Sequence, residues 1–134
     1  MKQFWPSIRS AIVHADDYLL GRKIALRVAA WTCIFAIAVL SLAPTKTIPR
    51  TGVGGKLEHV IAYAIATFLT ALAYNDGWRV IISFLSYAGV LEFLQQFSPG
   101  RMSSVGDYLF SAVGIGIGVA VFALLRKLSR PRFQ

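Results

Sequence analysis

The feature that most constrains this chain is an apolar stretch at residues 28–45 that contains no Asp, Glu, Lys or Arg. A stretch of this length can cross the hydrocarbon core of a bilayer as one helix. The composition agrees, because 56% of the 134 residues are hydrophobic and only 15% are charged, less charge than soluble domains carry. The single cysteine, Cys33, lies inside this stretch and cannot form an intramolecular disulfide.

Three further apolar stretches follow, at residues 57–74, 79–97 and 104–125. Each is long enough to span a membrane as a helix. Pro44 and Pro49 are expected to end the first helix, and Asn75-Asp76-Gly77 is typical of a turn. Residues 24–125 therefore predict four transmembrane helices within one domain, 1–134. The predicted fold class is all-α, an integral membrane four-helix bundle.

The N-terminal segment, residues 1–22, has a different pattern. Its apolar side chains recur at spacings of three and four and form one helical face: Trp5, Ile8, Ile12, Ala15 and Leu19. Charged residues lie off this face. The pattern predicts an N-terminal amphipathic helix lying in the membrane interface. The alternative is a helix that packs against a partner.

Charge predicts the orientation in the membrane. The net charge is +8, and the basic residues gather in the N-terminal segment and in the tail, 126–134. Because Lys and Arg favour the cytoplasmic side and four spans return the chain to its starting side, both termini are predicted to be cytoplasmic. Three basic residues near the first linker oppose this assignment: Lys46, Arg50 and Lys56. Basic residues that flank apolar stretches suit membrane lipids better than nucleic acid, which we do not expect as a partner.

Polar residues interrupt the apolar pattern around the third linker. Glu92 and Gln95 lie near the end of the third predicted helix, and Arg101, Ser104 and Asp107 follow the Pro99-Gly100 turn. Ser104 and Asp107 have the spacing of a capping box. With loops one and three on the outer face, Lys56, Glu58 and His59 from the second helix are expected at the same membrane depth. Ionisable side chains inside a membrane protein are usually functional.

Gly114 and Gly118 form a GxxxG pair in the fourth predicted helix. Small residues allow two helix backbones to approach closely within a bilayer. Packing against the second or third helix of the same chain is the favoured interpretation, and dimerisation is the alternative.

These residues together resemble the VanZ-like family of small bacterial membrane proteins. The resemblance covers residues 40–118 and rests on four groups: Leu40-Ser41-Leu42 with Pro44; Lys56, His59 and Tyr63; Glu92, Gln95, Pro99-Gly100-Arg101, Ser104 and Asp107; and Gly114 with Gly118. Two positions depart from the family pattern. Gly55 stands where the family usually has aspartate, and Ser111 where it often has asparagine.

The resemblance implies a multi-pass protein of the bacterial inner membrane that acts in the cell envelope. One member of the family is linked to low-level resistance to the glycopeptide teicoplanin. The resemblance implies no defined reaction.

Three functions fit the predicted cluster. In the first, it binds the headgroup of an anionic lipid or of a polyprenyl-phosphate-linked envelope precursor. Arg101 and Lys56 would contact the phosphate with help from Gln95, Ser104, His59 and the start of the fourth helix, while Glu92 and Asp107 orient the cations. Tyr63 is a further candidate binding residue.

The second function is enzymatic, with carboxylates and a histidine acting on a lipid headgroup as a hydrolase or transferase would. The sequence has no HExxH, GxSxG or Cys-His arrangement, and Glu58 and His59 are expected on different helix faces. One histidine with three carboxylates is a poor zinc set, although Glu92 and Asp107 could hold magnesium. We therefore predict no metal and no other cofactor. The third function is structural: the cluster only fixes how the helices of an accessory subunit meet, with a membrane protein as its partner.

Overall fold

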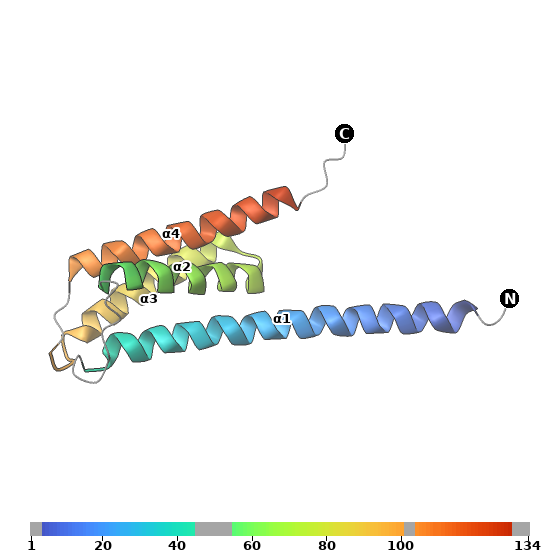
Figure 1. The fold of residues 1–134 in the computed structure, drawn as a ribbon, viewed down its shortest axis with the longest axis horizontal. Coiled ribbons are helices and arrows are strands. Elements are labelled where there is room, and N and C mark those ends of the chain that lie inside the picture. The colour runs from blue at the N-terminus through green and yellow to red at the C-terminus, as the bar shows by residue number, and fades with distance from the viewer. Residues whose placement is uncertain (1–3, 45–54, 101–103, 130–134) are drawn as a thin grey trace.

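The protein is a bundle of four helices in a computed structural model that describes residues 4–44, 55–100 and 104–129 (Figure 1). Side chains are described from residue 19 onward. The helices are α1 (Phe4–Leu42), α2 (Gly55–Tyr74), α3 (Gly77–Gln95) and α4 (Val105–Leu128). Each contains a segment long and apolar enough to cross a membrane, and in α1 this segment is Leu19–Leu42. The predicted all-α membrane bundle is confirmed.

Helix α1 is longer than any one predicted element. The predicted N-terminal helix and the first spanning helix form one continuous helix of 39 residues. At 1.5 Å per residue it is about 58 Å long, whereas a hydrocarbon core is about 30 Å thick. Its N-terminal half extends past the other three helices (Figure 1). The interfacial orientation of residues 1–22 remains a prediction, since the side chains before residue 19 lie outside the described part.

The turn between α2 and α3 is formed as its sequence predicts. Asn75 adopts a positive φ of 53°, a conformation that asparagine tolerates better than most residues. The Asp76 carboxylate then accepts a hydrogen bond from the Arg79 backbone N–H at 3.1 Å and caps α3. This bond satisfies one of the free N–H groups at the start of the helix.

The predicted capping box at the start of α4 does not form. Ser104 is the N-cap residue, but its side chain makes no capping hydrogen bond. Its backbone N–H donates to Glu92 Oε1 of α3 instead of to the side chain of Asp107. A capping box uses Glu or Gln at the third helical position, and the shorter Asp107 reaches less far. The Glu92 carboxylate of the neighbouring helix α3 therefore accepts the hydrogen bond that Asp107 would accept in a capping box.

Two other helix ends differ from prediction. Helix α3 ends at Gln95, two residues before Phe97, and a turn follows in which Ser98 N–H donates to the Gln95 carbonyl at 3.0 Å. Helix α4 continues past Leu125 to Leu128, so Arg126 and Lys127 lie in its last turn. Basic side chains are favourable there because the helix dipole is negative at its C-terminus.

The closest packing in the bundle joins α2 to α4. A Cβ on Gly114 would collide with the Val60 carbonyl oxygen, and a Cβ on Gly118 would lie 2.5 Å from the Ala64 carbonyl oxygen. Both oxygens belong to the backbone of α2. The GxxxG pair therefore packs within the chain against α2, as the favoured interpretation predicts.

Helix α1 packs on α2 and α3 but, among the described residues, not on α4. Its buried residue Ile37 joins the core that Tyr63, Phe84 and Ile115 build from the other helices. Two hydrogen bonds tie α3 and the turn that follows it to the C-terminal half of α1. The Tyr87 hydroxyl donates to the Ile34 carbonyl, and the Ser98 hydroxyl donates to the Leu42 carbonyl at 3.0 Å.

Thr67 provides a test of this packing. It is fully buried between α2 and α4, and within the described residues its hydroxyl has no hydrogen-bond partner. Because a buried hydroxyl without a partner is unfavourable, Thr67→Val is expected to stabilise the protein by about 1 kcal/mol. The matched control is Thr70→Val, which removes a hydrogen bond to the Ala66 carbonyl at 2.7 Å and should cost about 0.6 kcal/mol. Unfolding in mixed micelles measures both, and a destabilised Thr67→Val protein would contradict the packing.

Candidate functional site

The predicted polar residues gather at one end of the bundle, here called the cluster end. It is formed by the C-terminal ends of α1 and α3 and the N-terminal ends of α2 and α4, at the left of Figure 1. Seven of the eight predicted site residues lie in the described part of this end: Lys56, His59, Tyr63, Glu92, Gln95, Ser104 and Asp107. The eighth, Arg101, lies outside the described residues. Gln95 is buried in the last turn of α3, with 3% of its surface exposed.

Four of the residues at the cluster end form a support network, defined as Glu92, Ser104, Asp107 and Ser111. Glu92 accepts the hydrogen bond from the Ser104 N–H and so joins α3 to the start of α4. One turn further along α4, the Ser111 hydroxyl donates to the Asp107 carbonyl at 2.9 Å. Glu92 and Asp107 both lie where the positive end of the α4 dipole stabilises a carboxylate.

His59 connects this network to α2. Its Nδ1 lies 3.3 Å from the Ser111 hydroxyl oxygen. When the Ser111 hydroxyl donates its one proton to the Asp107 carbonyl, its oxygen accepts from the Nδ1–H of His59. This tautomer leaves Nε2 available for another partner. The His59 ring also stacks on Tyr63 one turn later, with centroids 6.3 Å apart and an angle of 16° between the planes.

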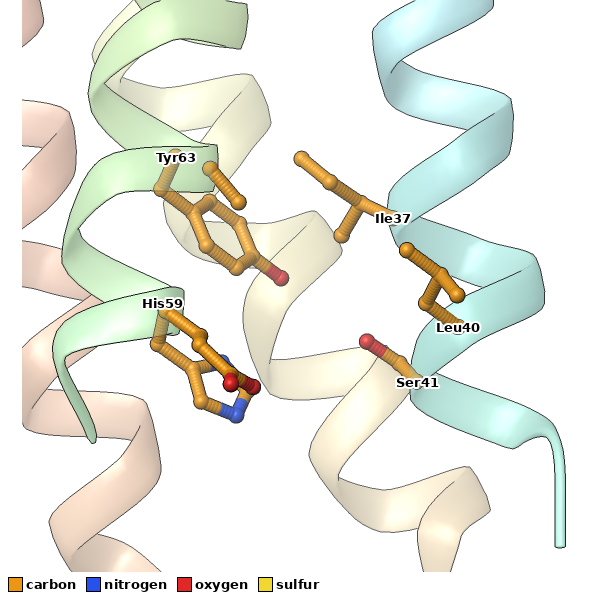
Figure 2. Close-up of a pocket in the computed structure, with 7 residues that line it drawn as sticks. Ile37, Leu40, Ser41, His59 and Tyr63 are labelled. Atoms are coloured by element: carbon orange, nitrogen blue, oxygen red, sulfur yellow. The ribbon is translucent and has the colours of Figure 1, made fainter. Parts of the chain in front are cut away.

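A small polar pocket opens between α1 and α2 beside His59. Its volume is about 120 Å³ and it is lined by Ile37, Leu40, Ser41, Glu58, His59, Ala62 and Tyr63. Figure 2 shows the hydroxyl groups of Ser41 and Tyr63 directed into the space between the two helices, with His59 on the same side of α2. A cavity of this size and polarity can hold several water molecules or one small anionic group.

Two pocket residues were not among the predicted site residues. Ser41 lies between Leu40 and Leu42 in the sequence, at the end of the first span. Its side chain carries a hydroxyl, and 7% of the residue's surface is exposed. Glu58 was expected to face away from His59, but both line the pocket. Consecutive helical residues point about 100° apart, so a pocket centred between these directions receives both side chains. In the sequence, the one sign that Ser41 belongs to the site is its position as a polar residue at the end of the first span.

Lys56 does not line this pocket. Its ammonium nitrogen lies 5.5 Å from the centre of the Phe110 ring on α4, a cation–π distance. The remaining predicted residues, Glu92, Gln95, Ser104 and Asp107, are also outside the lining. The cluster end therefore has two parts: a pocket between α1 and α2, and a support network between α3 and α4, joined through His59.

The arrangement limits the chemistry of Ser111 and the carboxylates. Ser111 lies at hydrogen-bond distance from a histidine, as a nucleophile would, but it is 2% exposed and its proton points to a backbone carbonyl. A substrate cannot reach such a hydroxyl. Across the described ranges, no three His, Cys, Asp or Glu side chains lie close enough together to hold a metal ion.

The fold and this site define a class: a small membrane protein with four spanning helices and a polar pocket at one end of the bundle. The chain matches the VanZ/LLP1 family over residues 10–126. It therefore belongs to the VanZ/LLP1 family, as its resemblance to VanZ-like proteins predicted. No curated protein and no solved structure matches the chain.

Proposed function

We propose that this protein binds the phosphate group of a lipid-linked cell-envelope precursor in the polar pocket between α1 and α2. The observation that carries the proposal is the convergence of three hydrogen-bonding side chains, Ser41, His59 and Tyr63, on one pocket at the cluster end of the bundle. Hydroxyl and imidazole groups of this kind bind phosphate oxygens. The apolar members of the lining, such as Ile37 and Leu40, suit the first carbons of a lipid chain.

Two of the three described carboxylates at the cluster end, Glu92 and Asp107, lie outside the pocket lining, which contains Glu58. Glu92 accepts the hydrogen bond from the N-cap of α4, and Asp107 lies in the first turn of that helix. The α4 dipole compensates both negative charges. The Nε2 side of the His59 ring can bond to a phosphate oxygen of the ligand while Nδ1 remains at hydrogen-bond distance from Ser111. Glu58 on the pocket wall can accept a hydrogen bond from a hydroxyl group of the headgroup.

The proposed orientation follows from the basic residues at the opposite end of the bundle. Arg22, Lys23 and Arg27 lie near the middle of α1, and Arg126 and Lys127 lie in the last turn of α4. Since Lys and Arg favour the cytoplasmic side, that end is cytoplasmic and the polar pocket faces the outer leaflet of a bacterial inner membrane. A lipid-linked wall precursor bound in that leaflet would account for the link of one family member to teicoplanin resistance.

Native mass spectrometry of the protein purified from bacterial membranes tests the proposal. A precursor lipid is expected on the wild-type protein, and its occupancy should fall about tenfold in His59→Ala, since a hydrogen bond to a charged group contributes about 1.5–3 kcal/mol. Ser41→Ala should reduce occupancy by a smaller factor.

The matched control is His14→Ala. Residue 14 lies on α1, 27 residues before Ser41 in the same helix, about 40 Å away along the axis. This variant should keep the wild-type occupancy. A bound population that contains only bulk phospholipid, at one level in all four proteins, would contradict the proposal.

A further inference from the structure

The opposite end of the bundle contains a larger cavity, here called the basic-end cavity. Its volume is about 450 Å³, within the size range of ordinary ligand sites. It lies between α1, α2 and α3, and the residues that matter most are Trp31, Ile34, Tyr74, Arg79, Val80 and Phe84. None of them takes part in the polar pocket.

The cavity lies where α1 and α3 diverge, away from the hydrogen bonds that join them toward the cluster end. The hydrogen bonds from Tyr87 in α3 and from Ser98 in the turn after α3 reach the C-terminal half of α1. Toward its start, α3 diverges from α1 (Figure 1). The floor of the resulting gap is apolar, because Val80 and Phe84 are 6% and 3% exposed and Ile34 lies opposite them. Such an apolar surface within membrane-spanning segments suits a hydrocarbon chain.

The mouth of the cavity is aromatic and basic. The Trp31 indole N–H donates to the Tyr74 hydroxyl at 3.1 Å, which joins α1 to α2 across the opening. The Arg27 guanidinium lies 5.3 Å from the centre of the Tyr74 ring. Tryptophan and tyrosine at this position are typical of the level of the lipid headgroups.

Arg79 supplies a second cation on the other side of the mouth. Its Nε lies 3.6 Å from Asp76 Oδ2, and 87% of its side chain is exposed. The contact with Asp76 uses only Nε, so the two terminal nitrogens can donate to a phosphate. Asp76 also lines the cavity, so the two guanidinium groups outweigh one carboxylate. The mouth is therefore net positive.

We propose that the basic-end cavity is a binding site for an anionic phospholipid of the leaflet at that end, with one acyl chain against Phe84 and the phosphate between Arg27 and Arg79. Basic pockets between transmembrane helices bind anionic headgroups in this way. A zwitterionic lipid would bring its own cation to the same mouth and bind less well. The site is independent of the polar pocket and of its proposed ligand.

Quenching of Trp31 fluorescence by brominated lipids tests the proposal. The full chain with Trp5→Phe and Trp78→Phe retains Trp31 as its one tryptophan, since the sequence has three. It is reconstituted in phosphatidylcholine vesicles that contain increasing fractions of brominated phosphatidylglycerol or of brominated phosphatidylcholine. The relative binding constant at Trp31 is expected to favour phosphatidylglycerol, by about fivefold for each basic side chain that contacts the phosphate.

The double substitution Arg27→Gln with Arg79→Gln should bring this preference close to one. The matched control is Arg126→Gln with Lys127→Gln, which removes the same charge from the same end of the bundle but from residues outside this cavity. The control should keep the preference. Equal quenching by the two lipids in the parent protein, or an equal loss of preference in both double variants, would overturn the proposal.

Ser83→Phe tests the acyl-chain part separately, because Ser83 lines the cavity and a larger side chain there would fill it. Quenching of Trp31 by both lipids should fall. Unchanged quenching by both lipids would place the bound chain outside the cavity and overturn that part of the proposal.

Discussion

Gly114→Val is expected to separate α2 from α4 and to unfold most of the protein under conditions in which the wild type is stable. Any Cβ at this position would collide with the Val60 carbonyl oxygen, and it would also lie 3.1 Å from the Tyr63 Cβ. The collision is with backbone, which cannot move aside as the tip of a side chain can. Overpacking at such a site costs about 3 kcal/mol or more, a large part of the stability of a small protein.

Gly118→Val should have an effect of similar size, because its added atoms would meet the Ala64 carbonyl and the backbone nitrogen of Phe68. Gly116 is the matched control. It lies on the same helix between the two sites, and a Cβ added there would meet nothing within 4 Å. Gly116→Ala should leave stability unchanged or raise it by up to about 1 kcal/mol, the usual gain for replacing a helical glycine.

Unfolding in mixed micelles, followed by circular dichroism, measures these variants. A folded Gly114→Val protein with wild-type stability would show that α2 and α4 do not approach as described. It would also remove the basis for the position of His59 beside Ser111.

Glu92→Ala is the second substitution with a large expected effect. It leaves the Ser104 N–H without its acceptor and removes the carboxylate that lies beside the start of α4. A hydrogen bond to a charged group contributes about 1.5–3 kcal/mol, so a loss of about 2 kcal/mol is expected. Glu92→Gln keeps an acceptor oxygen and should lose about half as much.

Asp107→Asn is the control for Glu92, because it removes a first-turn charge from α4 without removing the acceptor of the Ser104 N–H. Its expected cost is about 0.5 kcal/mol. Measuring lipid occupancy together with stability distinguishes a role of Glu92 in binding the ligand from its role in the support network. A Glu92→Gln protein with wild-type stability and no bound lipid would assign Glu92 to the ligand and contradict its role in the support network.

Much of this fold can be read from the sequence because each span must satisfy its own backbone hydrogen bonds within the bilayer. Residues 28–45 carry no charge, and Asn75-Asp76-Gly77 marks a turn, so the number and order of spans follow directly. The GxxxG pair also predicts close packing of two helices, because two small residues one turn apart let the backbones approach. The sequence alone left both α2 and α3 open as the partner helix.

The details of the site were harder to predict because they depend on how each helix is rotated about its axis. Ser41 faces the pocket only because α1 packs its Ile37 face against α2 and α3. Glu58 and His59 both line the pocket because its centre lies between the directions in which the two side chains leave α2. The partner of Glu92 is a backbone N–H, which no pattern of side chains reveals. The continuity of α1 through residue 23 could have been predicted, because no proline interrupts that stretch and the isolated Gly21 does not end a helix.

The most direct test of the central claim is the distance between the His59 imidazole and a lipid phosphate. The sequence has two histidines, so His14→Gln leaves His59 as the one histidine that can carry a ¹⁵N label. The labelled protein is placed in bilayers of a phosphorus-free glycolipid, with polyprenyl phosphate as the one source of ³¹P, and solid-state NMR measures the ¹⁵N–³¹P dipolar coupling. A coupling to Nε2 at the distance of one N–H···O–P hydrogen bond is the predicted result. No coupling at His59 in the presence of excess polyprenyl phosphate would contradict the proposed function.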